Sequence, residues 1–203
     1  MADKISSGEE KAWEIILNLD SVDVCKRVKV EFDRETASYQ LKSFGFDFSI
    51  SLLERKIKNI DEKGEILTKK LSYFFNHSVL SYLVNAKEIP LSGRLIQPRN
   101  IGGGEIFFRG THILPLDRVS EKYGNDKKGF ISRGKELDGK FLDYGDASVE
   151  LHPLPRIPVT LILWLSDEEF PARTDILFDS TCEIQIPLDI IWSIAMMSIL
   201  AFL

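Results

Sequence analysis

The stretch Ile66 to Ala86, which reads ILTKKLSYFFNHSVLSYLVNA, decides the fold because it is the most strongly helical segment of the chain. Its apolar residues recur every three or four positions and form one stripe along a helix; they are Leu67, Leu71, Phe74, Phe75, Val79, Tyr82 and Leu83. Most of the stability of such a helix comes from packing its apolar face against other elements, so we expect this helix to organise the core.

Before this helix the pattern changes to a period of two. Apolar residues alternate with polar ones in the segments 28–32, 39–41 and 46–52, and a further strand is expected around 57–60. This alternation predicts antiparallel strands, joined at Asp33-Arg34-Glu35 and broken at Gly45. Two helices should precede them, one opening at the capping box Ser7-Gly8-Glu9-Glu10 and one over Val22 to Arg27.

After the long helix the sequence predicts more helices, then strands, then a last helix. Helices are expected near Glu105 and over 116–123 and 127–137, strands over 149–151, 159–165 and 176–178, and a closing helix after Pro187. The order lacks a regular strand–helix–strand alternation. We therefore predict an α+β fold, with residues 1–203 forming a single domain in which a mostly antiparallel sheet packs with helices.

Composition and charge exclude several classes of protein. The 203 residues are 44% hydrophobic and 28% charged, which is typical of a soluble globular protein. The net charge of −5 gives no general attraction to nucleic acid or to an anionic membrane. Cys25 and Cys182 stand at no metal-ligand spacing, and two free thiols favour the reducing cytoplasm. The start, Met1 to Ile5, lacks the apolar core of a signal peptide.

The apolar end of the chain, Ile190 to Leu203, could be taken for a membrane anchor. Its 14 residues would span about 21 Å as a helix, less than a hydrocarbon core of about 30 Å. We therefore expect a buried core helix or a helix at a subunit contact rather than a tail anchor.

Polar residues with chemical capacity gather at two places. One is Arg109-Gly110-Thr111-His112, where His112 could move protons or act as a ligand. The other follows the apolar run 161–165, where loops commonly hold binding groups. Together they give these candidate ligand-binding residues: Arg109, His112, Asp167, Glu168, Glu169, Arg173 and Asp179.

Two interpretations of the acidic residues stay open. Carboxylate oxygens could hold a hard divalent cation, to which His112 could add a nitrogen. Alternatively, Asp167 and Glu168 cap a turn or pair with Arg109 and Arg173. The glycines 102–104 likewise allow an anion site at a helix start or a simple bend, and they match no nucleotide-binding spacing.

Several motifs in the second half of the chain keep an order that is found in one family. The densest is Trp164-Leu165-Ser166-Asp167-Glu168-Glu169-Phe170-Pro171, followed by Ile176-Leu177-Phe178-Asp179. The others, in the same order as in the family, are Phe107-Phe108-Arg109-Gly110, Leu114-Pro115-Leu116, Tyr123-Gly124, Gly139, Gly145-Asp146 and Leu154-Pro155-Arg156-Ile157-Pro158. By these motifs the chain resembles the family catalogued as domain of unknown function 3786. It departs from that family at Leu165-Ser166, where a glycine is expected before the aspartate.

The resemblance implies a small protein of anaerobic bacteria or archaea. Members stand alone or are fused behind a cysteine-rich iron–sulfur segment of the kind associated with corrinoid and one-carbon enzymes. This chain lacks that segment, so an iron–sulfur or corrinoid protein would act in trans. The resemblance implies neither an activity nor a cofactor.

Three functions are therefore considered. The first is a cytoplasmic accessory protein that binds a ligand or partner through the Arg109/His112 and Asp167/Glu168/Glu169 faces. The second is a metal-assisted hydrolase or transferase that uses the same carboxylates. The third is a structural subunit docked through its closing helix. For the first two we expect the two faces to converge on one pocket.

Overall fold

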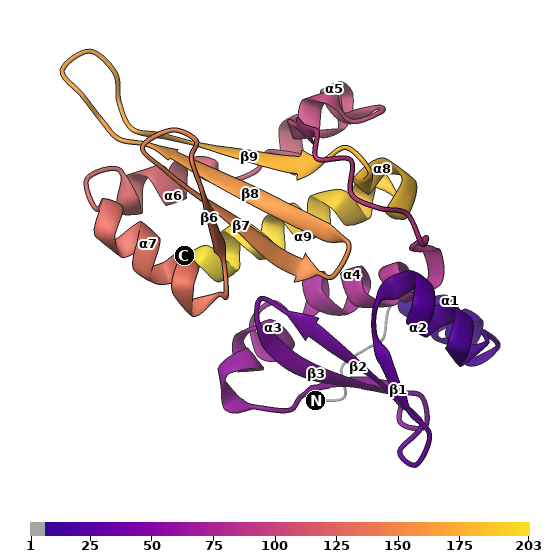
Figure 1. Ribbon diagram of the computed structural model, residues 1–203. Coiled ribbons are helices and arrows are strands. Elements are labelled where there is room, and N and C mark those ends of the chain that lie inside the picture. Colours follow the sequence, from indigo (N-terminus) through magenta and orange to yellow (C-terminus); the bar gives the residue numbers. More distant parts are fainter. Residues whose placement is uncertain (1–6) are drawn as a thin grey trace.

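Two antiparallel sheets form the frame of the protein, whose computed structural model describes residues 7–203 (Figure 1). The smaller sheet has the order β1-β2-β3-β4, formed by Glu31–Asp33, Ser38–Ser43, Phe46–Ser51 and Lys56–Asn59. The larger sheet has the order β5-β9-β8-β7-β6, formed by Leu95–Ile96, Arg173–Asp179, Ile157–Trp164, Ala147–Leu154 and Lys140–Leu142. Residues 1–5, for which no signal peptide was predicted, lie outside the described part of the chain, as does the side chain of Ser7 from the predicted capping box.

Helices precede, separate and follow the sheets. Their bounds are α1 Ser7–Leu17, α2 Ser21–Val28, α3 Glu65–Lys69, α4 Ser72–Asn85, α5 Gly104–Phe107, α6 Leu116–Tyr123, α7 Lys127–Glu136, α8 Cys182–Gln185 and α9 Leu188–Phe202. Single 3-10 turns are η1 Glu62–Gly64, η2 Pro98–Asn100 and η3 Gly110–His112. Within residues 7–203, helices make up 44% of the residues and strands 24%, all strand pairs are antiparallel, and the α+β prediction is confirmed.

The predicted continuous helix over 66–86 is wrong in one respect, because the backbone breaks between α3 and α4. The amide of Leu71 donates to the carbonyl of Ile66, five residues back, and Leu71 leaves helical geometry at φ −108° and ψ 14°. The apolar stripe nevertheless continues across the break, since Leu67, Leu71 and Phe75 are all buried. The spacing of apolar residues therefore identifies the buried face but not the break.

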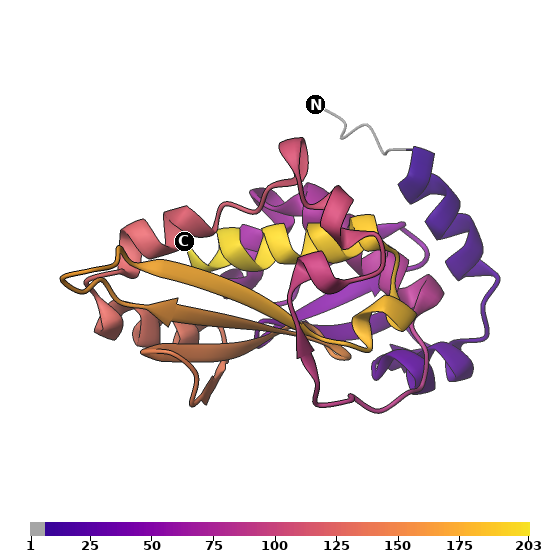
Figure 2. The same ribbon diagram turned by 90° about the horizontal axis from the view of Figure 1, so that it is seen from above.

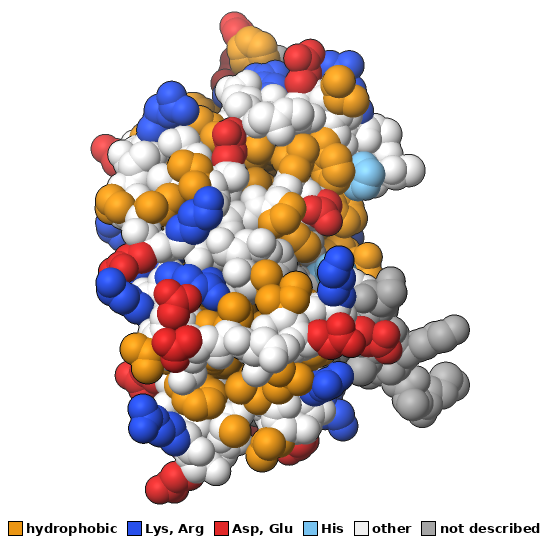
Figure 3. Space-filling model, turned by 90° about the vertical axis from the view of Figure 1, so that its right-hand side faces the viewer, with side chains coloured by type: hydrophobic (Ala, Val, Ile, Leu, Met, Phe, Trp, Pro, Cys, Tyr) orange, Lys and Arg blue, Asp and Glu red, His pale blue; other side chains and the backbone are white. Residues whose placement is uncertain are grey.

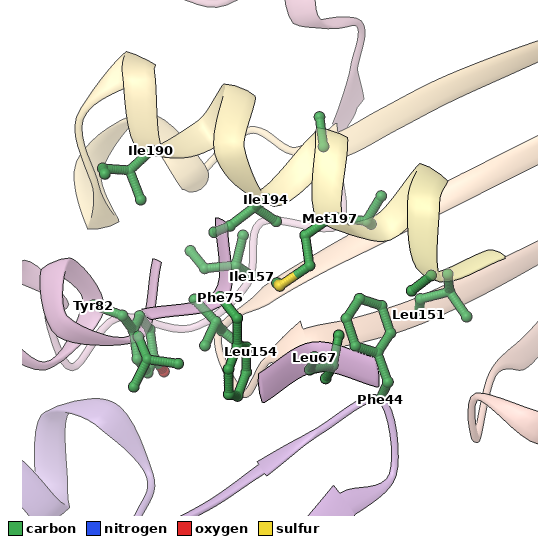
Figure 4. Close-up of a cluster of buried hydrophobic side chains, with 14 of the residues drawn as sticks. Phe44, Leu67, Phe75, Tyr82, Leu151, Leu154, Ile157, Ile190, Ile194 and Met197 are labelled. Carbon is green, nitrogen blue, oxygen red and sulfur yellow. The ribbon is translucent and has the colours of Figure 1, made fainter. Parts of the chain in front are cut away.

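The core lies around α9, which is apolar on all sides. Figure 4 shows Ile190, Ile194 and Met197 of this helix packed with α4 and the β7–β8 hairpin. Its polar side chains bond to backbone: the hydroxyl of Ser193 donates to the carbonyl of Phe74, and that of Ser198 to the carbonyl of Ile194. The prediction of a buried core helix is confirmed, and within residues 7–203 no helix has the length and apolarity to cross a membrane.

The two sheets meet at the β2–β3 turn. The amide of Phe44 donates to the carbonyl of His152, and the hydroxyl of Ser43 to that of Pro153, where the β7–β8 register shifts. In Figure 1 the larger sheet lies in front of α9, and in Figure 2 α6 and α9 cover one face of this sheet. All residues of β8 from Ile157 to Leu163 are buried, and α6, α7 and α9 contact the strands of this sheet.

Arg156 ties the β7–β8 hairpin to α2. Its side chain is 8% exposed, and its guanidinium donates to the carbonyls of Arg27 at 2.6 Å, Ile89 at 3.1 Å and Lys26 at 3.2 Å. Two of these carbonyls belong to the last turn of α2, where helical carbonyls lack partners. A guanidinium offers five donors, so one side chain can satisfy several such groups.

Candidate functional site

The structure does not bring the seven candidate residues together. Asp167, Glu168 and Glu169 lie in the β8–β9 loop, which ends where β9 begins at Arg173. Asp179 is the last residue of β9 and lies about 20 Å from Arg173, at about 3.3 Å per residue. Figures 1 and 2 both show this loop projecting from one end of the molecule, far from α5 and η3, which carry or adjoin Arg109 and His112. The expected convergence on one pocket is therefore wrong, because β9 separates its two halves.

Asp167 shapes the projecting loop. Its Oδ1 accepts the amides of Phe170 at 2.7 Å and Glu169 at 2.9 Å, and these hydrogen bonds lower the pKa of its carboxyl. The side chains of Glu168 and Glu169 are exposed, as is Phe170 at 65%. The structure therefore agrees with the turn-capping interpretation for Asp167.

The base of this loop joins several of the family motifs. The carboxylate of Asp146 accepts the amide of Leu165 at 2.8 Å, and the hydroxyl of Ser166 donates to Asn125 at 2.8 Å. Gly124 packs so closely on Ala172 that an added Cβ would lie 2.4 Å from that methyl group. These motif residues therefore hold α6, the β6–β7 turn and the β8–β9 loop together.

Arg173 lies over an aromatic ring beside the loop. Its guanidinium carbon is 4.7 Å from the centre of the Trp164 ring, and the indole Nε1 of Trp164 donates to Asp175 at 2.9 Å. A cation over an indole face is attracted to it electrostatically, so this contact fixes both side chains.

Asp179 is buried and fully engaged in structure. Its carboxylate accepts hydrogen bonds from the amide and hydroxyl of Thr181, the amide and hydroxyl of Ser92, and the amide of Gly93. Burial alone would raise the pKa of Asp179, but these hydrogen bonds outweigh it and the pKa is lowered. The carboxylate thus fastens the segment before β5 to the end of β9 and is not open to a ligand.

Arg109 and His112 lie at the opposite end from the projecting loop. Arg109 pairs with Glu105 at 3.0 Å, and both side chains are largely exposed. The ring of His112 stacks on Phe107 at 4.3 Å and meets Trp192 edge-on at 5.1 Å. The carbonyl of His112 also accepts the indole Nε1 of Trp192 at 3.0 Å, so α9 fixes the histidine in place.

These rings belong to a larger surface, which we call the aromatic face. It continues from Trp192 to Phe74 at 5.8 Å and from Phe74 to Tyr73 at 5.5 Å, and it is flanked by exposed aliphatic side chains. Its members are Tyr73, Phe74, Ile106, Phe107, His112, Ile113 and Trp192. Figure 3 views this end of the molecule, where orange hydrophobic side chains lie beside a pale-blue histidine.

A hollow of about 300 Å³ adjoins the same segment. It is bounded by Phe108, Leu114 and Leu116 on one side and by Ile176 and Asp175 of β9 on the other. The neighbouring glycines form a bend: Gly103 has φ +76°, and the amide of Gly102 donates to the carboxylate of Glu183 at 3.1 Å. In the described part of the chain, no three His, Cys, Asp or Glu side chains are placed to hold a metal ion.

The sequence indicated His112 and Arg109 but not the rings around them. Phe107 and Trp192 are 85 residues apart, and Trp192 was grouped with the apolar closing helix. Trp192 lies on a stripe of α9, with Leu188, Met196 and Leu200, that the rest of the protein covers only in part. Nothing in the sequence indicated that Ile106 and Ile113 are exposed, because isoleucine is among the residues most often buried.

Comparison with known proteins gave one match. The family model described as "Domain of unknown function (DUF3786)" matches residues 20–201, nearly the whole chain. A search of curated proteins and a search of solved structures each found no match.

Proposed function

The chain belongs to the DUF3786 family, and on that premise we propose that it is an accessory protein that binds another protein through the aromatic face. One observation carries the proposal: Ile106 is 81% exposed and Ile113 is 65% exposed, on either side of the stacked Phe107 and His112 rings. Large apolar side chains gathered on a surface mark sites where another molecule excludes water.

The composition of the face supports a protein partner. Aromatic residues and arginine are enriched in the cores of protein interfaces, and the face offers Tyr73, Trp192 and the adjacent Arg109. The rings are held rigidly by stacking and by the Trp192 hydrogen bond, so little side-chain entropy is lost on docking. The hollow beside Phe108 can receive one anchoring side chain of the partner.

We propose an iron–sulfur or corrinoid protein of the reducing cytoplasm as the partner. The class of partner rests on the family resemblance, and two free cysteines support the compartment. The carboxylates once considered for metal-assisted chemistry are instead assigned to structure at Asp167 and Asp179, which makes partner binding the better supported function.

The experiment compares three forms of the full chain as bait in an anaerobic lysate. They are the natural chain, a variant with Ile106→Asp and Ile113→Asp, and a control with Leu53→Asp. Leu53 is 79% exposed in the β3–β4 turn, so its substitution places a negative charge on an exposed apolar position away from the face.

The natural chain and the Leu53→Asp control should recover the same protein, and the double variant at least tenfold less, with circular dichroism unchanged in all three. Equal recovery by the three baits, or no protein retained by the natural chain, would refute the proposal. Light scattering that shows a dimer lost only in the double variant would assign the face to a second copy of the chain and also refute a separate partner.

A further inference from the structure

A second site lies at the far end of α9 from the aromatic face. A cavity of about 700 Å³ opens where α6, α7 and the α3–α4 junction surround the last turn of α9. Figure 1 shows this end of α9 beside α6 and α7. The volume falls within the range of about 300 to 1,000 Å³ that is usual for small-molecule sites.

The cavity is positively charged in a negatively charged protein. Lys70, Arg118, Lys122 and Arg133 line it, against one acidic residue, Glu136. The whole chain has a net charge of −5. Cations gathered in a hollow raise the local concentration of anions.

Two of the four cations are explained by the fold. Arg133 donates to the carbonyl of Ala201 and pairs with Glu136 at 2.6 Å, and Lys122 donates to the carbonyl of Leu203. The hydroxyl of Tyr123 donates to the carbonyl of Phe202 at 3.0 Å. These contacts satisfy carbonyls in the last turn of α9, which a helix cannot pair internally.

The other two cations have no such role. The side chains of Lys70 and Arg118 are exposed and form no hydrogen bond or ion pair with any residue in the described range 7–203. Both line the cavity, one from the α3–α4 junction and one from α6. An anionic group in the cavity would therefore meet two cations whose charge nothing in the fold offsets.

One part of the cavity wall is apolar. Ile66, Leu200 and Leu203 pack against the core on one side yet are only half-buried, and they line the cavity on the other. Inorganic anions would leave this apolar surface in contact with water, whereas an aliphatic chain would cover it.

We propose that this cavity binds a small anionic amphiphile, with a carboxylate or phosphate head at Lys70 and Arg118 and an aliphatic tail on Ile66, Leu200 and Leu203. The site uses none of the residues of the aromatic face. The proposal therefore stands or falls separately from partner binding.

Isothermal titration of the full chain with decanoate and with decyl phosphate tests the proposal. The natural chain should bind at least one of them saturably, and whichever binds tighter identifies the head group. Lys70→Gln with Arg118→Gln should weaken that binding about tenfold, since two exposed charge contacts are lost together. Arg55→Gln with Lys56→Gln removes the same charge from the β3–β4 turn and should leave the affinity within twofold.

Two further titrants separate the contributions of head and tail. Decyltrimethylammonium keeps the tail and reverses the charge, and inorganic phosphate keeps the charge and lacks the tail, so each should bind at least tenfold more weakly. The proposal is overturned if either binds as tightly as the better anionic amphiphile, if neither anionic amphiphile binds saturably, or if the two double variants lose affinity equally.

Discussion

Replacing Asp179 with asparagine tests whether this residue is structural, as its contacts indicate. Its Oδ1 accepts the amide and hydroxyl of Ser92 at 3.1 and 3.0 Å and the amide and hydroxyl of Thr181 at 3.0 and 2.6 Å. Its Oδ2 accepts the amide of Gly93 at 2.7 Å. An asparagine amide can present one acceptor oxygen, so its NH₂ group must face one of these donor sets.

The least costly orientation keeps the oxygen at the Oδ1 position. The NH₂ group then faces the amide of Gly93, so one charge-assisted hydrogen bond is lost and a buried donor is left without an acceptor. A hydrogen bond to a charged group contributes about 1.5 to 3 kcal/mol, and an unsatisfied buried donor costs about 1 to 3 kcal/mol. We expect Asp179→Asn to lower the free energy of unfolding by roughly 3 to 5 kcal/mol, a large part of a typical domain's stability.

The control is Asp167→Asn, the same substitution in an exposed turn. Only Oδ1 of Asp167 accepts amides, those of Glu169 and Phe170, and an asparagine oxygen can accept both. The free energy of unfolding should therefore change by less than about 1 kcal/mol. Urea unfolding at pH 7, followed by tryptophan fluorescence and circular dichroism, measures both variants.

The dependence on pH gives an independent check. The pKa of Asp179 is lowered in the folded protein. Its carboxylate therefore stabilises the fold fully at pH values above the pKa of the unfolded chain, about 3.9. This stabilisation is lost as the pH falls through the lower pKa of the folded protein. The stability difference between the natural chain and Asp179→Asn should shrink below about pH 4. A loss at pH 7 no larger than that of Asp167→Asn, or a difference that stays constant down to pH 3, would refute the structural role.

Two other predictions concern buried groups. Arg156→Met should lower the free energy of unfolding, measured in urea, by about 3 to 5 kcal/mol, because three backbone carbonyls lose a charged donor. The control Arg55→Met, in an exposed turn, should change it by less than about 0.5 kcal/mol. Similar losses for both variants would show that the Arg156 contacts contribute little. The thiol of Cys182 is buried, and burial, helped by the nearby Glu183, raises its pKa to about 12. Iodoacetamide at pH 8 should therefore alkylate Cys182 far more slowly than the half-buried Cys25, with the difference vanishing in urea; equal rates in the folded protein would contradict its burial.

Apolar periodicity predicted most of the fold because burial depends on which face of an element is apolar. The strands around Phe48 and Leu161 and the helix around Phe75 follow from this relation, and each is buried as expected. The break before α4 could not be predicted, since Leu71 satisfies the helical pattern while its amide bonds five residues back. Periodicity reports side-chain direction, and this break changes the backbone hydrogen bonds without changing that direction.

The candidate site was harder to predict, because whether its residues meet in space depends on how the strands are connected and not on which motifs the sequence contains. The acidic turn after Trp164 was correctly placed at the end of a strand, but that strand's partner runs antiparallel to it. Asp179 is therefore carried to the opposite end of the sheet from Asp167. The sequence predicted a short strand over 176–178 between the two residues, but not that β9 begins at Arg173 and carries Asp179 along the whole sheet.

The positions of the motif residues bear on where function should be sought. Arg156 and Asp179 bond to backbone, Asp146 accepts a backbone amide, and Gly124 packs against a neighbouring methyl group, so these parts of the family pattern maintain the frame. The stretch Phe107-Phe108-Arg109-Gly110 differs from them, because it directs rings and a charge to the surface. The stability of the fold explains the contacts of Arg156, Asp179, Asp146 and Gly124. It does not explain the rings and the charge at 107–110, since exposed rings stabilise a fold little. The stretch that brings Phe107 and Arg109 to the aromatic face is therefore the part of the family pattern that a binding function explains best.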